Sequence, residues 1–167
     1  MEITNNALVE FKDKQAEVID CLLELLRLLN DAEREVWKRY CELQAKIRDR
    51  RPSAAQISLE SDAMWTDYHE ECKKIAEPRC TEKLLKKGLV REFSNIPRYA
   101  YIDDTDDCRG TFSMETAKKA VVEFRFTKHS SVRFMHKFTL VPSGETWLVD
   151  AFNYGTEREG VWHRGQI

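Results

Sequence analysis

The sequence predicts an α+β protein in which helices from the first half of the chain cover an antiparallel β-sheet built from the second half. Two patterns support this prediction. Over residues 8–47, apolar residues recur mainly at steps of three and four without an interrupting Gly or Pro, which is typical of one side of a helix. Over residues 120–154, three alternating runs are separated by two short polar turns, which is typical of an antiparallel meander.

Length and composition indicate one ordinary globular domain. The chain has 167 residues, of which 42% are hydrophobic, and no repeat or linker marks a second unit. We expect a single domain over residues 1–167, with a helical part at about 8–88 and a sheet part at about 98–167. The 27 basic and 29 acidic residues leave no basic surplus, so direct binding of nucleic acid is not expected.

The cysteines and apolar stretches predict a cytoplasmic protein. The five cysteines form no closely spaced pairs, and no cleavable apolar leader precedes them, which is typical of thiols that stay reduced. No apolar stretch approaches the roughly 20 residues that cross a bilayer, so no membrane partner is expected.

The first helical region leaves two possibilities open. It forms one long helix or two collinear helices, because Asn30 and Asp31 could cap a second helix. Its heptad-like spacing also permits a coiled coil, although packing on the protein's own sheet is the more ordinary explanation for so short a pattern. Pro52 marks the end, because proline disfavours helix in the residue before it.

The other segments are shorter, and each is predicted from its local pattern. In the first half we expect frayed residues at 1–6, a loop at 52–58, a helix at 59–76, and helical turns at 81–87 that end at Gly88. In the second half we expect an edge strand at 99–102 and a short strand at 108–112. We also expect turns at 128–131 and 142–145, with a positive backbone angle at Gly144.

Alternation within the meander places its apolar side chains on a common face. The three runs contribute Ala120, Val122, Phe124 and Phe126, then Val132, Phe134, His136, Phe138 and Leu140, and finally Trp147, Val149 and Ala151. So much aromatic and branched surface needs a cover, and we expect the N-terminal helices to supply it.

His136 is the one titratable residue on this apolar face. It is either a hydrogen-bonded core histidine or an acid or base in a pocket, with Asp150 or Tyr101 as its partner. The core histidine is the more ordinary interpretation. Asp150 could equally face solvent on the other side of its strand.

An acidic loop is the second candidate site. Asp103, Asp104, Asp106 and Asp107 surround Thr105, and four neighbouring carboxylates repel one another unless they are solvated, bind a cation or meet a basic partner. The EF-hand spacing for calcium is absent. The sequence also lacks zinc, nucleophile-elbow and phosphate-loop motifs, so we expect no catalytic residue, metal or cofactor.

Several short motifs resemble those of a known superfamily. They are Val36-Trp37-Lys38, the stretch 75–81 with Lys83 after it, Ile96-Pro97-Arg98-Tyr99, Phe138-Thr139-Leu140, Trp147-Leu148-Val149-Asp150 and Trp162. In this order they resemble the nuclear transport factor 2 (NTF2) superfamily, and within it the bacterial NTF2-fold immunity proteins that are encoded beside polymorphic toxins. Lys38 departs from the acidic residue usual at that position.

The resemblance implies an NTF2-like cone, with helices packed on a curved sheet that is mostly antiparallel with a mixed edge. It also implies an immunity protein that binds a cognate toxin domain and neutralises it, with no enzymatic activity. The aspartates of the acidic loop would then contact the toxin. The alternative is a small-molecule-binding NTF2-like enzyme of the isomerase or dehydratase type that uses His136 with Asp150 or Tyr101. A homodimer formed through the open sheet face is a third possibility.

Overall fold

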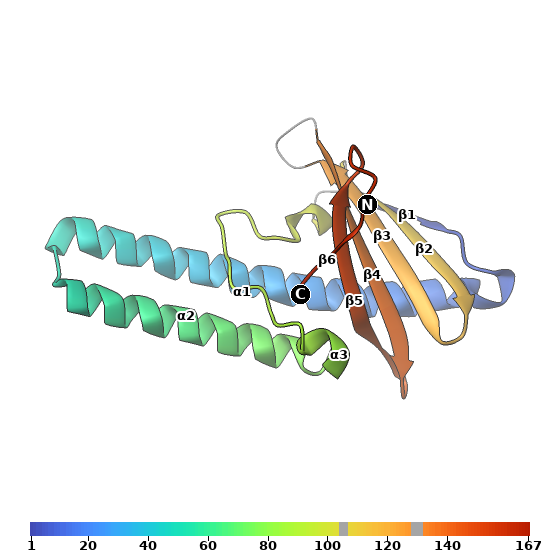
Figure 1. Ribbon diagram of the computed structural model, residues 1–167, viewed down its shortest axis with the longest axis horizontal. Helices are drawn as coiled ribbons and strands as arrows, with labels where there is room; N and C mark the ends of the chain where they lie inside the picture. Colours follow the sequence, from blue (N-terminus) through green and yellow to red (C-terminus); the bar gives the residue numbers. More distant parts are fainter. Residues whose placement is uncertain (104–106, 128–131) are drawn as a thin grey trace.

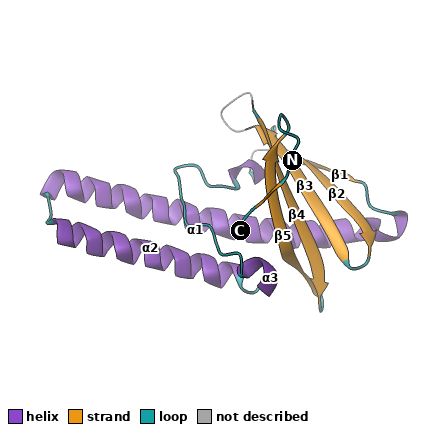
Figure 2. Cartoon of the chain, viewed as in Figure 1, coloured by secondary structure: helices purple, strands orange, loops and turns teal. Residues whose placement is uncertain are grey.

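The computed structural model describes residues 1–103, 107–127 and 132–167 as a helical layer against a β-sheet (Figure 1, Figure 2). The described helices are the 3-10 helix η1 (Val9–Lys14), α1 (Gln15–Arg50), α2 (Ala54–Ala76), α3 (Glu82–Leu85) and the 3-10 helix η2 (Ala100–Ile102). The described strands are β1 (Glu2–Asn5), β2 (Arg109–Thr116), β3 (Lys119–Thr127), β4 (Arg133–Ser143), β5 (Thr146–Thr156) and β6 (His163–Arg164).

The strands lie side by side in the order of the sequence, from β1 to β6. β1 pairs parallel with β2, and each later pair is antiparallel, so the sheet is mixed at one edge and does not close. The predicted α+β class is confirmed, and the arrangement is consistent with an NTF2-like cone. None of the helices among the described residues is both long and apolar enough to span a membrane.

The first residues of the chain are ordered, so the prediction of a frayed segment at 1–6 is wrong. They form β1 and pair with β2, with Ile3 opposite Gly110. A β-carbon at Gly110 would lie 2.8 Å from the Ile3 side chain, so glycine allows this close approach. The pairing joins residues more than a hundred positions apart and leaves no local sequence signal.

α1 is one continuous helix of 36 residues, which decides between the two possibilities left open by the sequence. Its first half crosses the sheet, and its second half projects past the sheet beside α2 (Figure 1). The ion pairs Arg39–Asp67 (2.8 Å) and Lys46–Glu60 (3.2 Å) join the two helices as an antiparallel hairpin. The apolar side of α1 therefore packs on the sheet first and on α2 further along.

α2 begins earlier than predicted, because a capping box fixes its start. The Ser53 hydroxyl accepts a hydrogen bond from the Gln56 amide (3.3 Å), and the Gln56 side chain accepts one from the Ser53 amide (3.1 Å). The expected loop at 52–58 is therefore mostly helix. The turns at 81–87 form as predicted, with Thr81 as the cap of α3 and Gly88 at a positive φ of 89°.

The meander forms as predicted, with the apolar faces of β3 and β4 in register. Ala120 pairs with Leu140, Val122 with Phe138, and Phe124 with His136, and most of these side chains are buried. Gly144 has the expected positive φ of 61° between β4 and β5. The turn predicted at 128–131 lies outside the described residues.

A β-bulge in β5 makes the predicted position of Ala151 wrong. Thr139 pairs with Ala151, but the next residue of β4, Leu140, pairs with Val149. Asp150 is the extra residue, and the alternation changes phase there. Phe152 consequently joins Val149 in the core in place of Ala151.

The bulge also attaches Asp150 to the segment that follows α2. The Val149 amide donates to the Arg79 carbonyl, and the Thr81 amide donates to the Val149 carbonyl, both over 2.9 Å. The Asp150 carboxylate accepts hydrogen bonds from the Thr81 hydroxyl (2.9 Å) and the Lys83 ammonium. Burial acts to raise the pKa of Asp150, but the hydrogen bonds from Lys83 and Thr81 and the charges of Lys83 and Lys87 outweigh it, so the pKa is lowered.

We expect Asp150→Asn to lower the free energy of unfolding near neutral pH by about 1 kcal/mol, because it removes the charge that pairs with the exposed Lys83. A carboxylate whose pKa is lower in the folded state than in the unfolded state stabilises the fold when it is ionised. This stabilisation is complete above the unfolded pKa of about 3.9 and is lost as the pH falls through the folded-state pKa. Urea unfolding should therefore show a difference in the free energy of unfolding between wild type and variant that becomes smaller at acidic pH. Glu82→Gln, on the exposed side of α3, is the control. A difference in the free energy of unfolding that stays constant down to about pH 3 would contradict this prediction.

Candidate functional site

The segment before β2 lies between α1 and the sheet, so the prediction of an edge strand at 99–102 is wrong. Residues 100–102 form η2, and Tyr99, Tyr101 and Ile102 are all buried. A half-exposed strand would alternate buried and exposed side chains, whereas a helical turn buries neighbouring ones together. The segment therefore packs its side chains into the core between helix and sheet.

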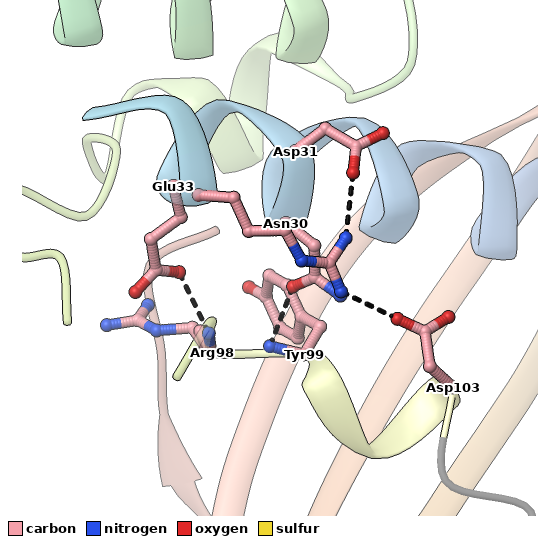
Figure 3. Close-up of polar contacts among 7 residues, drawn as sticks. Asn30, Asp31, Glu33, Arg98, Tyr99 and Asp103 are labelled. Atoms are coloured by element: carbon pink, nitrogen blue, oxygen red, sulfur yellow. Dashed lines mark hydrogen bonds and ion pairs between the residues drawn. The ribbon is translucent and has the colours of Figure 1, made fainter. Parts of the chain in front are cut away.

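Three side chains of α1, which we call the α1 clamp, hold this segment (Figure 3). Asn30 Oδ1 accepts a hydrogen bond from the Tyr99 amide (3.0 Å). Glu33, which is 7% exposed, accepts one from the Arg98 amide (2.8 Å) and one from the Ser94 amide (3.0 Å). Arg34, the third member, pairs with Asp31 (2.8 Å) and with Asp103 (2.9 Å) at the end of η2.

The clamp places two tyrosine rings on the core face of the sheet. Tyr101 stacks on Phe126 with ring centroids 3.9 Å apart, and Tyr99 meets Phe152 edge to face at 6.2 Å. Burial raises the pKa of Tyr101 well above its ordinary value and raises that of Tyr99 to about 12. Both phenols are consequently neutral at physiological pH.

The structure brings together two of the three predicted pocket residues. His136 Nδ1 and the Tyr101 hydroxyl are 2.9 Å apart, and the His136 ring lies edge to face against Phe126 and Phe152 at 4.9 Å. Asp150 is elsewhere, because its carboxylate is bonded to Thr81 and Lys83, whereas His136 pairs with Tyr154 further along β5. His136 is thus surrounded by aromatic rings.

A pocket of about 480 Å³ remains beside this aromatic filling, and we call it the tail pocket. Its walls come from the loop after α3, the strands β4 and β5, and the C-terminal tail. It is lined by Val90, Arg98, His136, Phe152, Tyr154, Arg164, Gly165 and Gln166. Its described lining contains two guanidinium groups and no carboxylate.

The acidic loop is described only in part. Asp103 forms its ion pair with Arg34, and Asp107 is exposed. Asp104 and Asp106 lie outside the described residues. Through Arg34, the start of the loop is attached to the surface of α1, which carries further carboxylates.

Those carboxylates rim a groove that sequence reasoning missed, which we call the α1–α2 groove. It has a volume of about 440 Å³ and an apolar floor. The lining consists of Leu28, Asp31, Ala32, Glu35, Val36, Arg39, Asp67, Tyr68, Glu71 and Ile75. The available signal was the i,i+4 spacing of acidic residues in each helix, but only the pairing of the helices places the two sets side by side.

Comparisons with known proteins identify no relative. No family model matches the chain, and no curated protein or solved structure matches it either. Within the described ranges, no three His, Cys, Asp or Glu side chains are grouped so that they could hold a metal ion.

We expect Glu33→Ala to lower the free energy of unfolding by about 2 to 4 kcal/mol, because it leaves two partly buried backbone amides without an acceptor. Glu35→Ala, on the exposed side of the same helix, should change it by less than about 0.5 kcal/mol. Denaturant unfolding measures both values. Hydrogen exchange of the Ser94 and Arg98 amides should also accelerate in the first variant. Equal stability of the two variants would show that the clamp does not hold the segment.

Proposed function

We propose that this protein is an immunity protein, which binds the toxin domain of a cognate bacterial toxin in the cytoplasm and blocks it by direct contact. The observation that carries the proposal is the filled interior. Tyr99 and Tyr101 are both buried where an NTF2-like enzyme would bind its substrate. A scaffold with a packed interior is suited to presenting a rigid outer surface to another protein.

The chemistry around His136 favours binding over catalysis. An isomerase or dehydratase needs an acid or base that faces bound substrate. Tyr101 is a neutral phenol against His136, and Asp150 is engaged by Lys83 and Thr81. The tail pocket adds no carboxylate from its described lining. These features support a structural role for His136.

The acidic surfaces suit a basic partner. The α1–α2 groove has four carboxylates and one guanidinium group in its described lining, so the lining itself keeps an acidic excess. Three of the carboxylates form ion pairs: Asp31 with Arg34, Asp67 with Arg39 and Glu71 with Lys74. Arg34 also connects the groove to Asp103 of the acidic loop. Toxin domains that act on nucleic acid need basic surfaces to bind phosphates. Complementary charge would accelerate their encounter with this face, and the apolar floor of the groove would supply contact area after docking.

The proposal predicts that cells expressing the toxin domain encoded beside this chain resume growth when the chain is co-expressed. His136→Gln should protect as well as wild type, because an immunity protein needs no catalytic histidine and the imidazole packs against aromatic rings. Growth curves and binding to the purified toxin domain measure the effect. Wild type that neither protects nor binds would contradict the immunity function. A folded His136→Gln variant that binds the toxin but fails to protect would favour the enzyme instead.

Changing all four aspartates of the acidic loop to asparagine should slow association with the toxin by about tenfold at low salt and should reduce the salt dependence of the rate. The matched control neutralises four acidic residues on other exposed surfaces. These are Asp13, Asp20, Glu115 and Glu145. Stopped-flow or surface-based kinetics give the rates, and thermal unfolding checks that loss of the Asp103–Arg34 pair leaves the fold intact. Unchanged association rates would remove the acidic loop from the interface.

A further inference from the structure

The tail pocket has a construction that the immunity function does not require. Its outer wall is the C-terminal tail. The hydrogen bonds that hold it include Gly165 N–H to the Phe152 carbonyl (2.9 Å), Val90 N–H to the Ile167 carbonyl (2.9 Å), and Gln166 Nε2 to the Lys87 carbonyl (2.6 Å). The tail is thereby fixed on one side to β5 and on the other to the loop after α3.

Glycine at position 165 sets the depth of the pocket. A β-carbon there would lie 2.4 Å from the Phe152 ring, which is too close for any other residue without displacing that buried ring. The backbone of the tail therefore rests directly on the aromatic floor. The Gly165 backbone and the buried Phe152 ring therefore form a fixed part of the pocket wall.

Two arginines enter this pocket without acidic partners. Arg98 donates one hydrogen bond to the Gln166 carbonyl (3.3 Å), and neither Arg98 nor Arg164 forms an ion pair within the described part of the chain. The carboxylate that contacts the Arg98 backbone is Glu33, and it accepts from the amides of Arg98 and Ser94. Two guanidinium groups thus line one pocket whose described lining contains no carboxylate, while the buried Glu33 lies beside Arg98 in the adjoining cavity.

We propose that the tail pocket binds a small organic anion. Guanidinium groups pair with carboxylates and phosphates through charge-assisted hydrogen bonds, so Arg98 and Arg164 would hold the anionic group. Phe152, Tyr154 and His136 provide aromatic surface for a flat apolar body, and the volume of about 480 Å³ is in the range of small-molecule sites. The ligand class is therefore an aromatic carboxylate or phosphate monoester. This site is independent of the toxin-binding surface.

Isothermal titration calorimetry with phenyl phosphate and with benzoate tests the proposal and distinguishes the two anionic groups. At least one should bind at millimolar or lower concentration. It should bind more tightly than phenol or inorganic phosphate, because it contacts both the arginines and the aromatic side chains of the pocket. Binding should weaken as salt is added. The absence of any binding by both probes at low ionic strength would overturn the proposal.

Variants identify the site. Arg164→Gln and Arg98→Gln should each weaken the binding of the better probe by about tenfold or more, because each removes a charged hydrogen-bond donor. Arg27→Gln, on an exposed face of α1, is the matched control and should bind as wild type does. The Arg164 side chain is exposed and forms no ion pair with the described residues, so its variant stays informative if Arg98→Gln unfolds. Wild-type affinity in Arg164→Gln would place the probe elsewhere and overturn the proposal.

Discussion

Hydrogen bonds between two buried side chains of α1 and the backbone of one loop organise this molecule. Asn30 and Glu33 lie on the side of the helix that faces the sheet, where an unpartnered amide or carboxylate would be costly. The amides of Ser94 and Arg98 donate to Glu33. The Tyr99 amide donates to Asn30 Oδ1, whereas Asn30 Nδ2 has no hydrogen-bond partner among the described residues. Helix and loop therefore fix each other, and the loop has little freedom to leave the space between helix and sheet.

The position of that loop determines what the rest of the fold can do. With Tyr101 packed on Phe126 and Tyr99 on Phe152, aromatic contacts fill the space between α1 and this part of the sheet. His136 then completes the aromatic packing and meets a neutral phenol. Among the described residues, the α1–α2 groove and the tail pocket are surfaces available for recognition.

Local sequence patterns predicted the elements whose determinants are local. The periodicity of α1, the alternation of β3 and β4 and the glycine turn at Gly144 were all recognisable, and the Ser53–Gln56 capping box was present but not used. What could not be predicted depends on contacts between distant segments. The parallel pairing of β1, the bulge at Asp150 and the helical turn at Tyr101 each follow from a partner far away in the chain.

The candidate sites also divide into one that the sequence predicted and others that depend on how distant segments pack. The pairing of His136 with Tyr101 was among the predicted alternatives, because both residues stand out against apolar neighbours. The α1–α2 groove and the tail pocket were missed, because composition reports only a nearly balanced charge of -2. The fold distributes these charges unevenly. The lining of the α1–α2 groove has four carboxylates and one arginine, and Arg98 and Arg164 lie in a pocket whose described lining contains no carboxylate. A net charge near zero therefore excludes a uniformly basic surface, but it is compatible with one face that attracts cations and another that attracts anions.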